Sequence, residues 1–168
     1  TWITTALPVG LVGLWIAALA DCDFTQAGGP LQYEEQATWF GDLGISYHVG
    51  FLGIGLWLAG LAVVVQAAAV AYAMRAGRDR PRAYFGLMLL LTGAIVGVFC
   101  AQDLLLFYVF WEAMLIPLYL LVGVWGGEGR QRATLLFVIY TMAGSLLMLA
   151  AIIVYGLSEG TFDIPLLR

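Results

Sequence analysis

Five long apolar stretches, separated by short polar connections, make up most of this chain. A helix rises about 1.5 Å per residue, so about 20 apolar residues cross the roughly 30 Å hydrocarbon core of a bilayer. The stretches are too long and continuous for the alternating strands of a membrane β-barrel. The pattern therefore predicts an all-α, polytopic transmembrane helix bundle of about five spans. Within a single membrane domain over residues 1–168, the expected spans are approximately 2–20, 51–74, 83–101, 104–125 and 133–156.

The composition agrees with a membrane protein. Of the 168 residues, 62% are hydrophobic and only 11% are charged, whereas roughly a quarter of a soluble domain is charged. The formal net charge is −4 and there is no lysine, so the basic patch of a nucleic-acid-binding protein is absent. The two cysteines lie in no metal-ligand spacing, and no phosphate-binding glycine motif occurs. We therefore expect a lipid bilayer around this chain, and no metal or nucleotide cofactor within it.

The polar connections alternate in the sign of their charge. Residues 21–49 carry five acids and no base, residues 75–82 carry four arginines, the tight link at 101–103 carries an acid, and residues 126–132 carry two arginines. Arginines concentrate in cytoplasmic loops of membrane proteins. We therefore expect loops 75–82 and 126–132 to be cytoplasmic and loop 21–49 to lie outside.

Several polar and small residues have ordinary structural readings. Residues 31–48 mix aromatic with charged side chains, and this mixture favours a segment along the membrane surface. His48 closes it, and we expect an interfacial anchor or a hydrogen-bonding surface group; because imidazole titrates near neutral pH, a proton relay is the alternative. Glycines at close-packing intervals, such as Gly93 and Gly97, favour close helix contacts, and Gln66 favours an interhelical hydrogen bond.

Glu112 is the one acid in the middle of an apolar span. It lies about eight residues after the expected start of its helix, which is about 12 Å into the membrane. A carboxylate at that depth costs at least a few kcal/mol on insertion scales, and intramembrane acids are functional by default. The acid can remain protonated and neutral, or it can face a wet or cationic interior of the bundle. We predict that Glu112 carries protons; an acid that only holds helices together is the alternative.

Three neighbours are candidates to assist Glu112. Tyr108 and Tyr119 lie four residues before and seven residues after it, on the same helical face, so their hydroxyls could extend a hydrogen-bonded water path. Their ordinary reading is interfacial packing. Pro117 has no N–H and clashes with the carbonyl of Ala113, so it predicts a kink and an exposed backbone acceptor near Glu112. The sequence places no arginine or lysine inside a span, so the chain offers Glu112 no cation at membrane depth.

The stretch around Glu112 resembles a known family. The sequence DLLLFYVFWEAMLIPLYLLVGVWGG (103–127) is similar to chain M (subunit 4) of bacterial NADH:quinone oxidoreductase, respiratory complex I, and to related antiporter-like subunits. The stretches LGISYH (43–48), RPRAYFGLMLLLTGAIVGVF (80–99), IYTMAGSLLMLAAI (139–152) and GTFDIPLL (160–167) fit the same family in the same order. The resemblance implies an antiporter-like fold of inverted repeats, of which these residues would be an N-terminal fragment.

The resemblance also implies a function. It makes Glu112 the key protonatable residue, paired with a lysine on a later helix beyond Arg168. It implies a proton-translocating subunit of the bacterial inner membrane, with other complex I membrane subunits as partners. NADH, FMN, iron–sulfur clusters and quinone would be bound by partner subunits, so this chain would perform no redox chemistry itself.

Two positions depart from the family pattern. Leu52 stands where the family usually has an acid, and Leu136 stands where it often has a lysine. Both departures remove charge from the expected proton path. Two alternatives to a complex I pump therefore stay open: an ion/proton antiporter subunit of the same fold, and a structural membrane bundle that does not pump.

Overall fold

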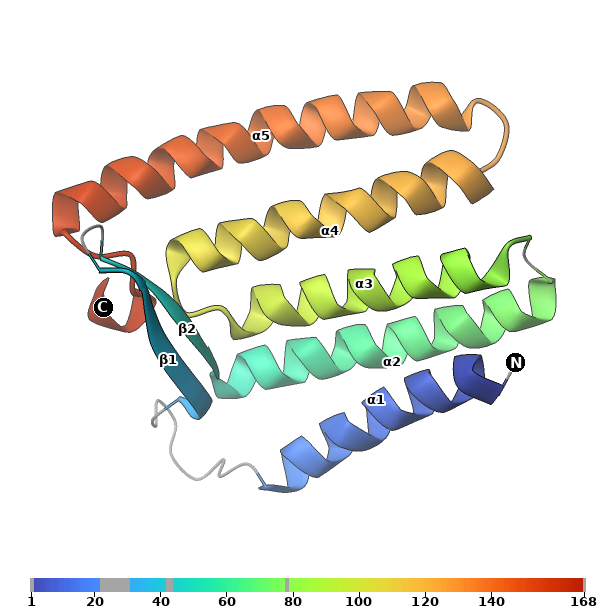
Figure 1. Ribbon diagram of the computed structural model, residues 1–168, viewed down its shortest axis with the longest axis horizontal. Helices are drawn as coiled ribbons and strands as arrows, with labels where there is room; N and C mark the ends of the chain where they lie inside the picture. Colours follow the sequence, from blue (N-terminus) through green and yellow to red (C-terminus); the bar gives the residue numbers. More distant parts are fainter. Residues whose placement is uncertain (1, 22–30, 42–43, 78, 168) are drawn as a thin grey trace.

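In the computed structural model, the described residues form five α-helices, one short hairpin and one 3₁₀ helix (Figure 1). The structure describes residues 2–21, 31–41, 44–77 and 79–167. The elements are α1 (Trp2–Asp21), β1 (Gln32–Phe40), β2 (Ile45–Phe51), α2 (Gly53–Ala76), α3 (Pro81–Cys100), α4 (Leu104–Trp125), α5 (Arg130–Glu159) and the 3₁₀ helix η2 (Ile164–Leu167).

The five helices occupy the five predicted spans, which confirms the predicted class of a membrane helix bundle. Helices α2, α3, α4 and α5 are long and apolar enough to cross a membrane, by length and composition. The 20-residue α1 is also a helix, and its crossing of the membrane stays a prediction. The predicted boundaries are within three residues of the observed ones, and α5 extends furthest beyond its prediction because its first turn contains the polar residues Arg130 and Arg132.

Local signals in the sequence set the helix ends. Pro81 begins α3, where its missing N–H is not needed and its fixed φ suits a helix. Gly77 and Gly160 end α2 and α5 with φ values of 60° and 72°. Only glycine adopts this left-handed conformation readily, so these two residues stop their helices.

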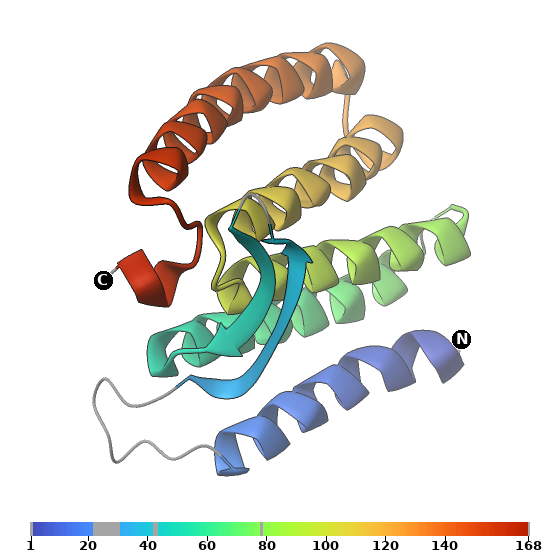
Figure 2. The same cartoon turned by 60° about the vertical axis from the view of Figure 1, so that its left-hand side comes forward.

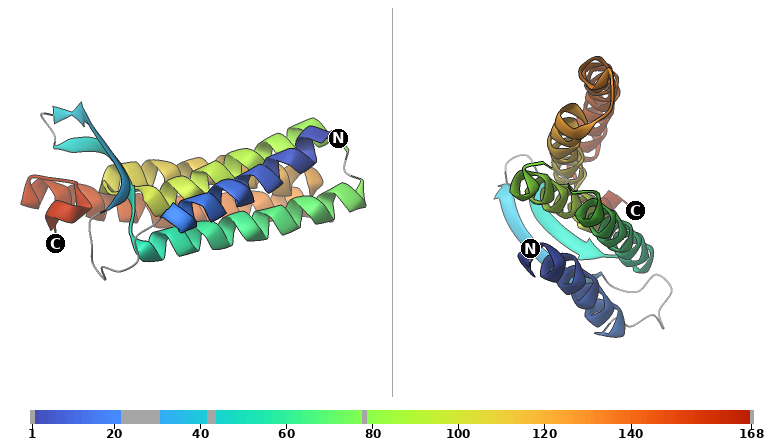
Figure 3. Two further views of the ribbon diagram at one scale, coloured as in Figure 1. Left: turned by 90° about the horizontal axis from the view of Figure 1, so that it is seen from below. Right: turned by 90° about the vertical axis from the view of Figure 1, so that its right-hand side faces the viewer.

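Each helix packs on the next one in the sequence, and α1 and α5 lie at opposite edges of the arrangement (Figure 3). A Cβ at Gly97 of α3 would collide with the ring of Phe110 on α4, and a Cβ at Gly60 of α2 would collide with the ring of Trp15 on α1. The Gln66 side chain donates a hydrogen bond of 2.8 Å to the Met88 carbonyl across α2 and α3. Close approach at glycine and the predicted interhelical hydrogen bond are therefore both present.

Other glycines do not mark contacts. A Cβ at Gly10, Gly13, Gly53 or Gly93 would meet no atom within 4 Å. Their predicted role in close packing therefore finds no support among the described residues.

Strands β1 and β2 form an antiparallel hairpin that lies across the ends of α2, α3 and α4 (Figure 2). The sequence pattern of residues 31–48 predicted a segment along the membrane surface and no strand. The signal was present, because Thr38, Trp39 and Phe40 precede a glycine-rich turn and Ile45 and Tyr47 follow it, and such residues favour strands. The all-α prediction therefore needs this one exception.

The connections alternate between the two ends of the bundle (Figure 1). The hairpin, the 101–103 link and the segment after α5 lie at one end, which we name the hairpin end. The α2–α3 and α4–α5 connections, which carry the arginines, lie at the other, which we name the arginine end. This separation is the one that the alternating charges predict, and which end faces the cytoplasm stays a prediction.

Candidate proton-binding sites

Glu112 lies near the middle of the 22-residue α4. It follows the first residue of the helix by eight positions, or about 12 Å along the axis. Its side chain is half-buried, and its Oε1 atom is buried with no hydrogen-bond partner among the described residues. Native proteins nearly always satisfy buried polar atoms, and the exceptions often lie where water, an ion or chemistry is accommodated. The unpartnered oxygen therefore marks Glu112 as a candidate site.

Tyr108 lies one helical turn before Glu112 on α4. Its hydroxyl interacts with the Glu112 carboxyl and also with the hydroxyl of Ser145 on α5. Ser145 is buried, with 4% of its surface exposed, and it donates a hydrogen bond of 3.1 Å to the Met142 carbonyl. Tyr108 thus links the acid to the α4–α5 contact, as its spacing from Glu112 predicts, while its role in a proton path stays a prediction.

Pro117 and Tyr119 differ in their surroundings. The Pro117 side chain is among the largest fully buried ones, inside α4. Because proline has no N–H, it cannot donate to the Ala113 carbonyl, which lies next to Glu112 in the sequence. Tyr119 is 41% exposed, and no hydrogen bond joins it to Glu112 within the described residues. The structure therefore brings Tyr108, but not Tyr119, into interaction with the acid.

Glu112 has no cationic partner in the described part of the chain. The described arginines lie at helix ends or in connections at the arginine end. Leu136, which replaces the family's frequent lysine, is 45% exposed on α5. Leu52, which replaces the usual acid, precedes α2 at the hairpin end. The two departures thus lie at opposite ends of the bundle.

A second group of titratable side chains, which the sequence pattern does not predict, lies at the hairpin end. His48 on β2 contacts Asp163 through Nδ1 and Glu34 of β1 through Nε2, each at 2.9 Å. We name Glu34, His48 and Asp163 the His48 cluster. Only 3% of the His48 surface and 4% of the Asp163 surface are exposed, while 46% of the Glu34 side chain is exposed. The expectation of a surface histidine was therefore wrong, although His48 does make hydrogen bonds.

Backbone pairing holds the His48 cluster in place. The 101–103 link lies between β2 and the segment after α5: Gln102 N donates to the His48 carbonyl at 2.8 Å, and Ile164 N donates to the Gln102 carbonyl at 2.8 Å. The side chain of Gln36 donates to Asp163 Oδ2 at 3.2 Å. No local motif signals this cluster, because Asp163 lies 115 positions after His48 and only the fold brings them together.

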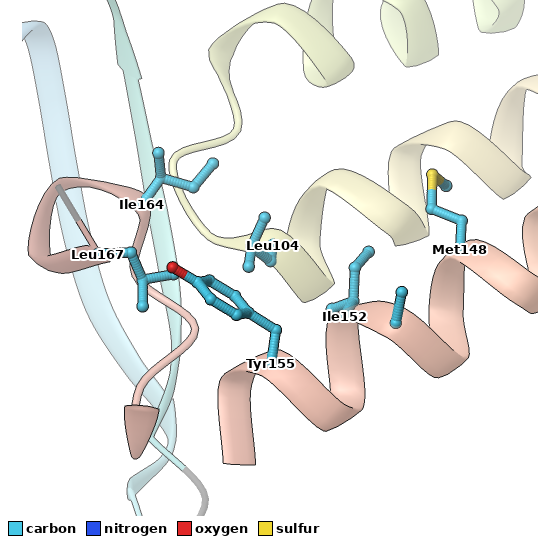
Figure 4. A pocket seen from close by; sticks show the side chains of 7 residues that line it. Leu104, Met148, Ile152, Tyr155, Ile164 and Leu167 are labelled. Atoms are coloured by element: carbon cyan, nitrogen blue, oxygen red, sulfur yellow. The ribbon is translucent and has the colours of Figure 1, made fainter. Parts of the chain in front are cut away.

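An open cavity near the hairpin end is apolar. It has a volume of about 390 Å³, lies between the start of α4, the end of α5 and η2, and is lined by Leu104, Met148, Ala151, Ile152, Tyr155, Ile164 and Leu167 (Figure 4). Its lining contains no carboxylate or imidazole. This cavity therefore offers no site for proton exchange.

Comparisons with known proteins agree with the fold and the motifs. The family described as NADH:quinone oxidoreductase/Mrp antiporter, TM, matches residues 101–168. An NAD(P)H-quinone oxidoreductase chain 4 of Microcystis aeruginosa is 40% identical over 94% of this chain. NADH-quinone oxidoreductase subunit M of Rhodobacter capsulatus is 35% identical over 97% of this chain. The chain spans 29% and 31% of the lengths of these two relatives.

A solved structure gives the same assignment. A chain of respiratory complex I from Thermus thermophilus with bound NADH superposes with a TM-score of 0.80 at 35% identity. The match covers 97% of this chain and 34% of that one. Sequence similarity and fold thus agree over nearly all of the chain, and the family profile agrees over residues 101–168. The chain belongs to the antiporter-like membrane subunits of the NADH:quinone oxidoreductase and Mrp antiporter family.

Proposed function

We propose that this chain is part of a proton-translocating membrane subunit of NADH:quinone oxidoreductase, in which Glu112 gains and loses the transported proton. The observation that carries this proposal is the buried, unpartnered Oε1 atom of Glu112 at the middle of an apolar helix. A carboxyl group with one buried oxygen left without a partner is suited to bind or release a proton when water or charge approaches it. The family membership supports the reaction class.

The side chains around Glu112 suit a proton path between α4 and α5. The Tyr108 hydroxyl is both a donor and an acceptor, and it interacts with Glu112 and Ser145. The Ala113 carbonyl, which Pro117 leaves without a donor, is a further acceptor for water. These groups let a short hydrogen-bonded chain form beside the acid without any charged residue of this chain.

The remaining partners belong to the rest of the assembly. Redox chemistry with NADH, FMN, iron–sulfur clusters and quinone would take place in other subunits, coupled to this one through the membrane arm. We place the protein in the bacterial inner membrane with the arginine end towards the cytoplasm, because arginines concentrate on that side.

The test is the substitution Glu112→Gln in the full-length protein within the assembled complex. Glutamine keeps the shape and hydrogen bonding of the acid but cannot ionise. In membrane vesicles, NADH-driven proton uptake and coupled quinone reduction should both fall sharply while subunit content stays normal. Glu128→Gln is the matched control, because it makes the same change in an exposed residue of the α4–α5 connection. Full proton transport in the Glu112 variant would contradict the assignment.

An ion/proton antiporter subunit of the same fold is the second candidate, favoured by the inclusion of Mrp antiporters in the matching family. The two differ in what drives the flux. Proton movement that requires NADH oxidation supports the respiratory complex. Sodium-driven proton movement of equal size without NADH would support the antiporter.

A structural bundle that does not pump is the third candidate. Leu52, Leu136 and the lack of a cation beside Glu112 favour it, because each removes charge from the expected path. Infrared difference spectra of the assembled complex, recorded with and without NADH, distinguish this case. A carboxyl band that responds to turnover and disappears in Glu112→Gln supports pumping, whereas an unchanged Glu112 carboxyl supports the structural bundle.

A further inference from the structure

The geometry of the His48 cluster requires an additional proton. Both ring nitrogens of His48 lie 2.9 Å from a carboxylate oxygen, one from Glu34 and one from Asp163. A neutral imidazole has one N–H donor and one lone pair. Its lone pair would face a carboxylate oxygen, and that contact is repulsive at 2.9 Å. The two contacts become hydrogen bonds only if the imidazole carries two protons or one carboxyl group is protonated.

The charges around the cluster favour the same proton. Two carboxylates and a neutral histidine would carry a charge of −2, much of it buried, and burial of uncompensated charge is costly. Asp103, the N-cap of α4 in the 101–103 link, adds a buried carboxylate nearby, which accepts a hydrogen bond from Ser46 N at 3.1 Å. Described arginines lie at the arginine end. Other titratable groups at the hairpin end are Asp21 of α1, Tyr33 and Glu35 of β1, Tyr47 of β2, Cys100 of α3, and Tyr155 and Glu159 of α5.

The cluster can exchange its proton with water on one side. Glu34 is about half exposed, whereas His48 and Asp163 are buried. A proton from the aqueous phase at the hairpin end would therefore reach His48 through Glu34. Within the described residues no hydrogen bond or ion pair joins the cluster to Glu112. Glu112 lies about 12 Å along α4 from the first residue of that helix.

The proton also holds separate parts of the chain together. His48 belongs to the hairpin, and Asp163 belongs to the segment after α5, which pairs with the 101–103 link through the bridge between Asp103 and Asp163. Loss of the proton leaves a lone pair against a carboxylate and removes one of the two histidine hydrogen bonds. The hydrogen bond from Gln36 to Asp163 would still join β1 to that segment.

We propose that Glu34, His48 and Asp163 form a second proton-binding site, whose bound proton fastens the hairpin to the segment after α5. This site is independent of the proposed role of Glu112. Loss of this proton, at a pH high enough to remove it, weakens the attachment at the hairpin end.

Nitrogen NMR on the full-length protein in its assembled complex, labelled with ¹⁵N-histidine and embedded in lipid, tests the proposal. The His48 signals are those missing in His48→Gln and shifted in Glu34→Gln. Near neutral pH, both ring nitrogens of His48 should be protonated or share a proton with a carboxyl group, and they should become those of a neutral ring as the pH rises. A neutral ring with one bare nitrogen at neutral pH would overturn the proposal.

Glu34 and Glu35 provide a matched pair on one strand. Glu34→Gln should move the loss of the proton to lower pH, while Glu35→Gln should leave it unchanged. In amide hydrogen exchange, corrected for the intrinsic effect of pH, protection of residues 45–51 and 161–167 should fall about tenfold or more at alkaline pH, as expected for one lost hydrogen bond to a charged group. Two results would reject the cluster as the cause. One is an equal shift of the pH of proton loss in Glu34→Gln and Glu35→Gln. The other is an alkaline loss of amide protection in His48→Gln as large as that in the wild-type protein.

Discussion

Replacing Asp103 by alanine should loosen the hairpin end more than any other single change in a connecting segment. Asp103 is fully buried, with 0% of its surface exposed. Its Oδ1 atom accepts hydrogen bonds from Leu105 N at 2.9 Å and Leu106 N at 3.1 Å, and so caps α4. Its Oδ2 atom accepts from Ser46 N at 3.1 Å and so joins the same helix end to β2. One carboxylate therefore satisfies three backbone donors.

The cost of the substitution follows from these three contacts. Loss of an N-cap side chain costs about 0.5–2 kcal/mol. The partly buried N–H of Ser46 loses its acceptor as well, and an unsatisfied buried donor costs about 1–3 kcal/mol. Asp103→Ala should therefore lower the free energy of opening at this end by about 1.5–5 kcal/mol. Asp103→Asn keeps an oxygen for the cap but presents an amide to Ser46, so about half of that cost should remain.

Amide hydrogen exchange by mass spectrometry measures this change locally in the assembled complex. A loss of 2 kcal/mol corresponds to about 30-fold faster exchange, and it should appear in residues 45–51 and in the first turn of α4. The control is Asp79→Ala, which removes an exposed acid at the arginine end. If Asp103→Ala exchanges at the wild-type rate in both segments, the carboxylate does not hold this end together and the reasoning is wrong.

Two further changes test the helix contacts. Gly97→Ala should destabilise the full-length protein by about 1–3 kcal/mol, because the new methyl group overlaps the Phe110 ring. Gly93→Ala is the control: a Cβ there meets nothing within 4 Å, so this variant should melt at the wild-type temperature in a tryptophan fluorescence scan. Equal melting temperatures of the two variants would refute the close contact. Gln66→Leu should lower the free energy of unfolding by less than about 1 kcal/mol in the same scan. Interhelical hydrogen bonds in membranes contribute about 0.6 kcal/mol on average, and the Met88 carbonyl keeps the Thr92 hydroxyl as a donor. A loss of several kcal/mol would contradict this small contribution.

Most of the helical architecture could be predicted from the sequence because it depends on local pattern. Apolar runs of about 20 residues specify helices in lipid, where the backbone must satisfy its own hydrogen bonds. Glu112 could be found for the same reason, since a carboxyl group inside such a run is conspicuous. Its contact with Tyr108 also follows from helical periodicity. Each of these features requires only neighbours within about two turns of one helix.

The polar structure at the hairpin end could not be predicted in this way. The partners of His48 lie 14 positions before it and 115 positions after it, and no periodicity relates them. Asp103 did carry a local signal, because an aspartate directly before an apolar helix is a common N-cap. Its bond to Ser46, 57 positions earlier, carried none. The burial of His48 follows from pairing between distant backbone segments, which a single sequence does not reveal.

Backbone hydrogen bonds join the 101–103 link to β2 and to the segment after α5. They fix the hairpin end of α5, so any tilt of this helix would take place about that end. At the opposite end, α4 is secured to the α2–α3 connection by the Trp125 indole, which donates to the Asp79 carbonyl at 2.8 Å. Helix α5 packs on α4 near that end, where the buried Thr134 lies beside Gly123. Its 30 residues form a lever of about 45 Å, so a tilt of about 10° would move its arginine end by about 8 Å. Rocking of α5 would therefore widen its separation from α4 progressively towards the arginine end, and hardly at all beside the hairpin.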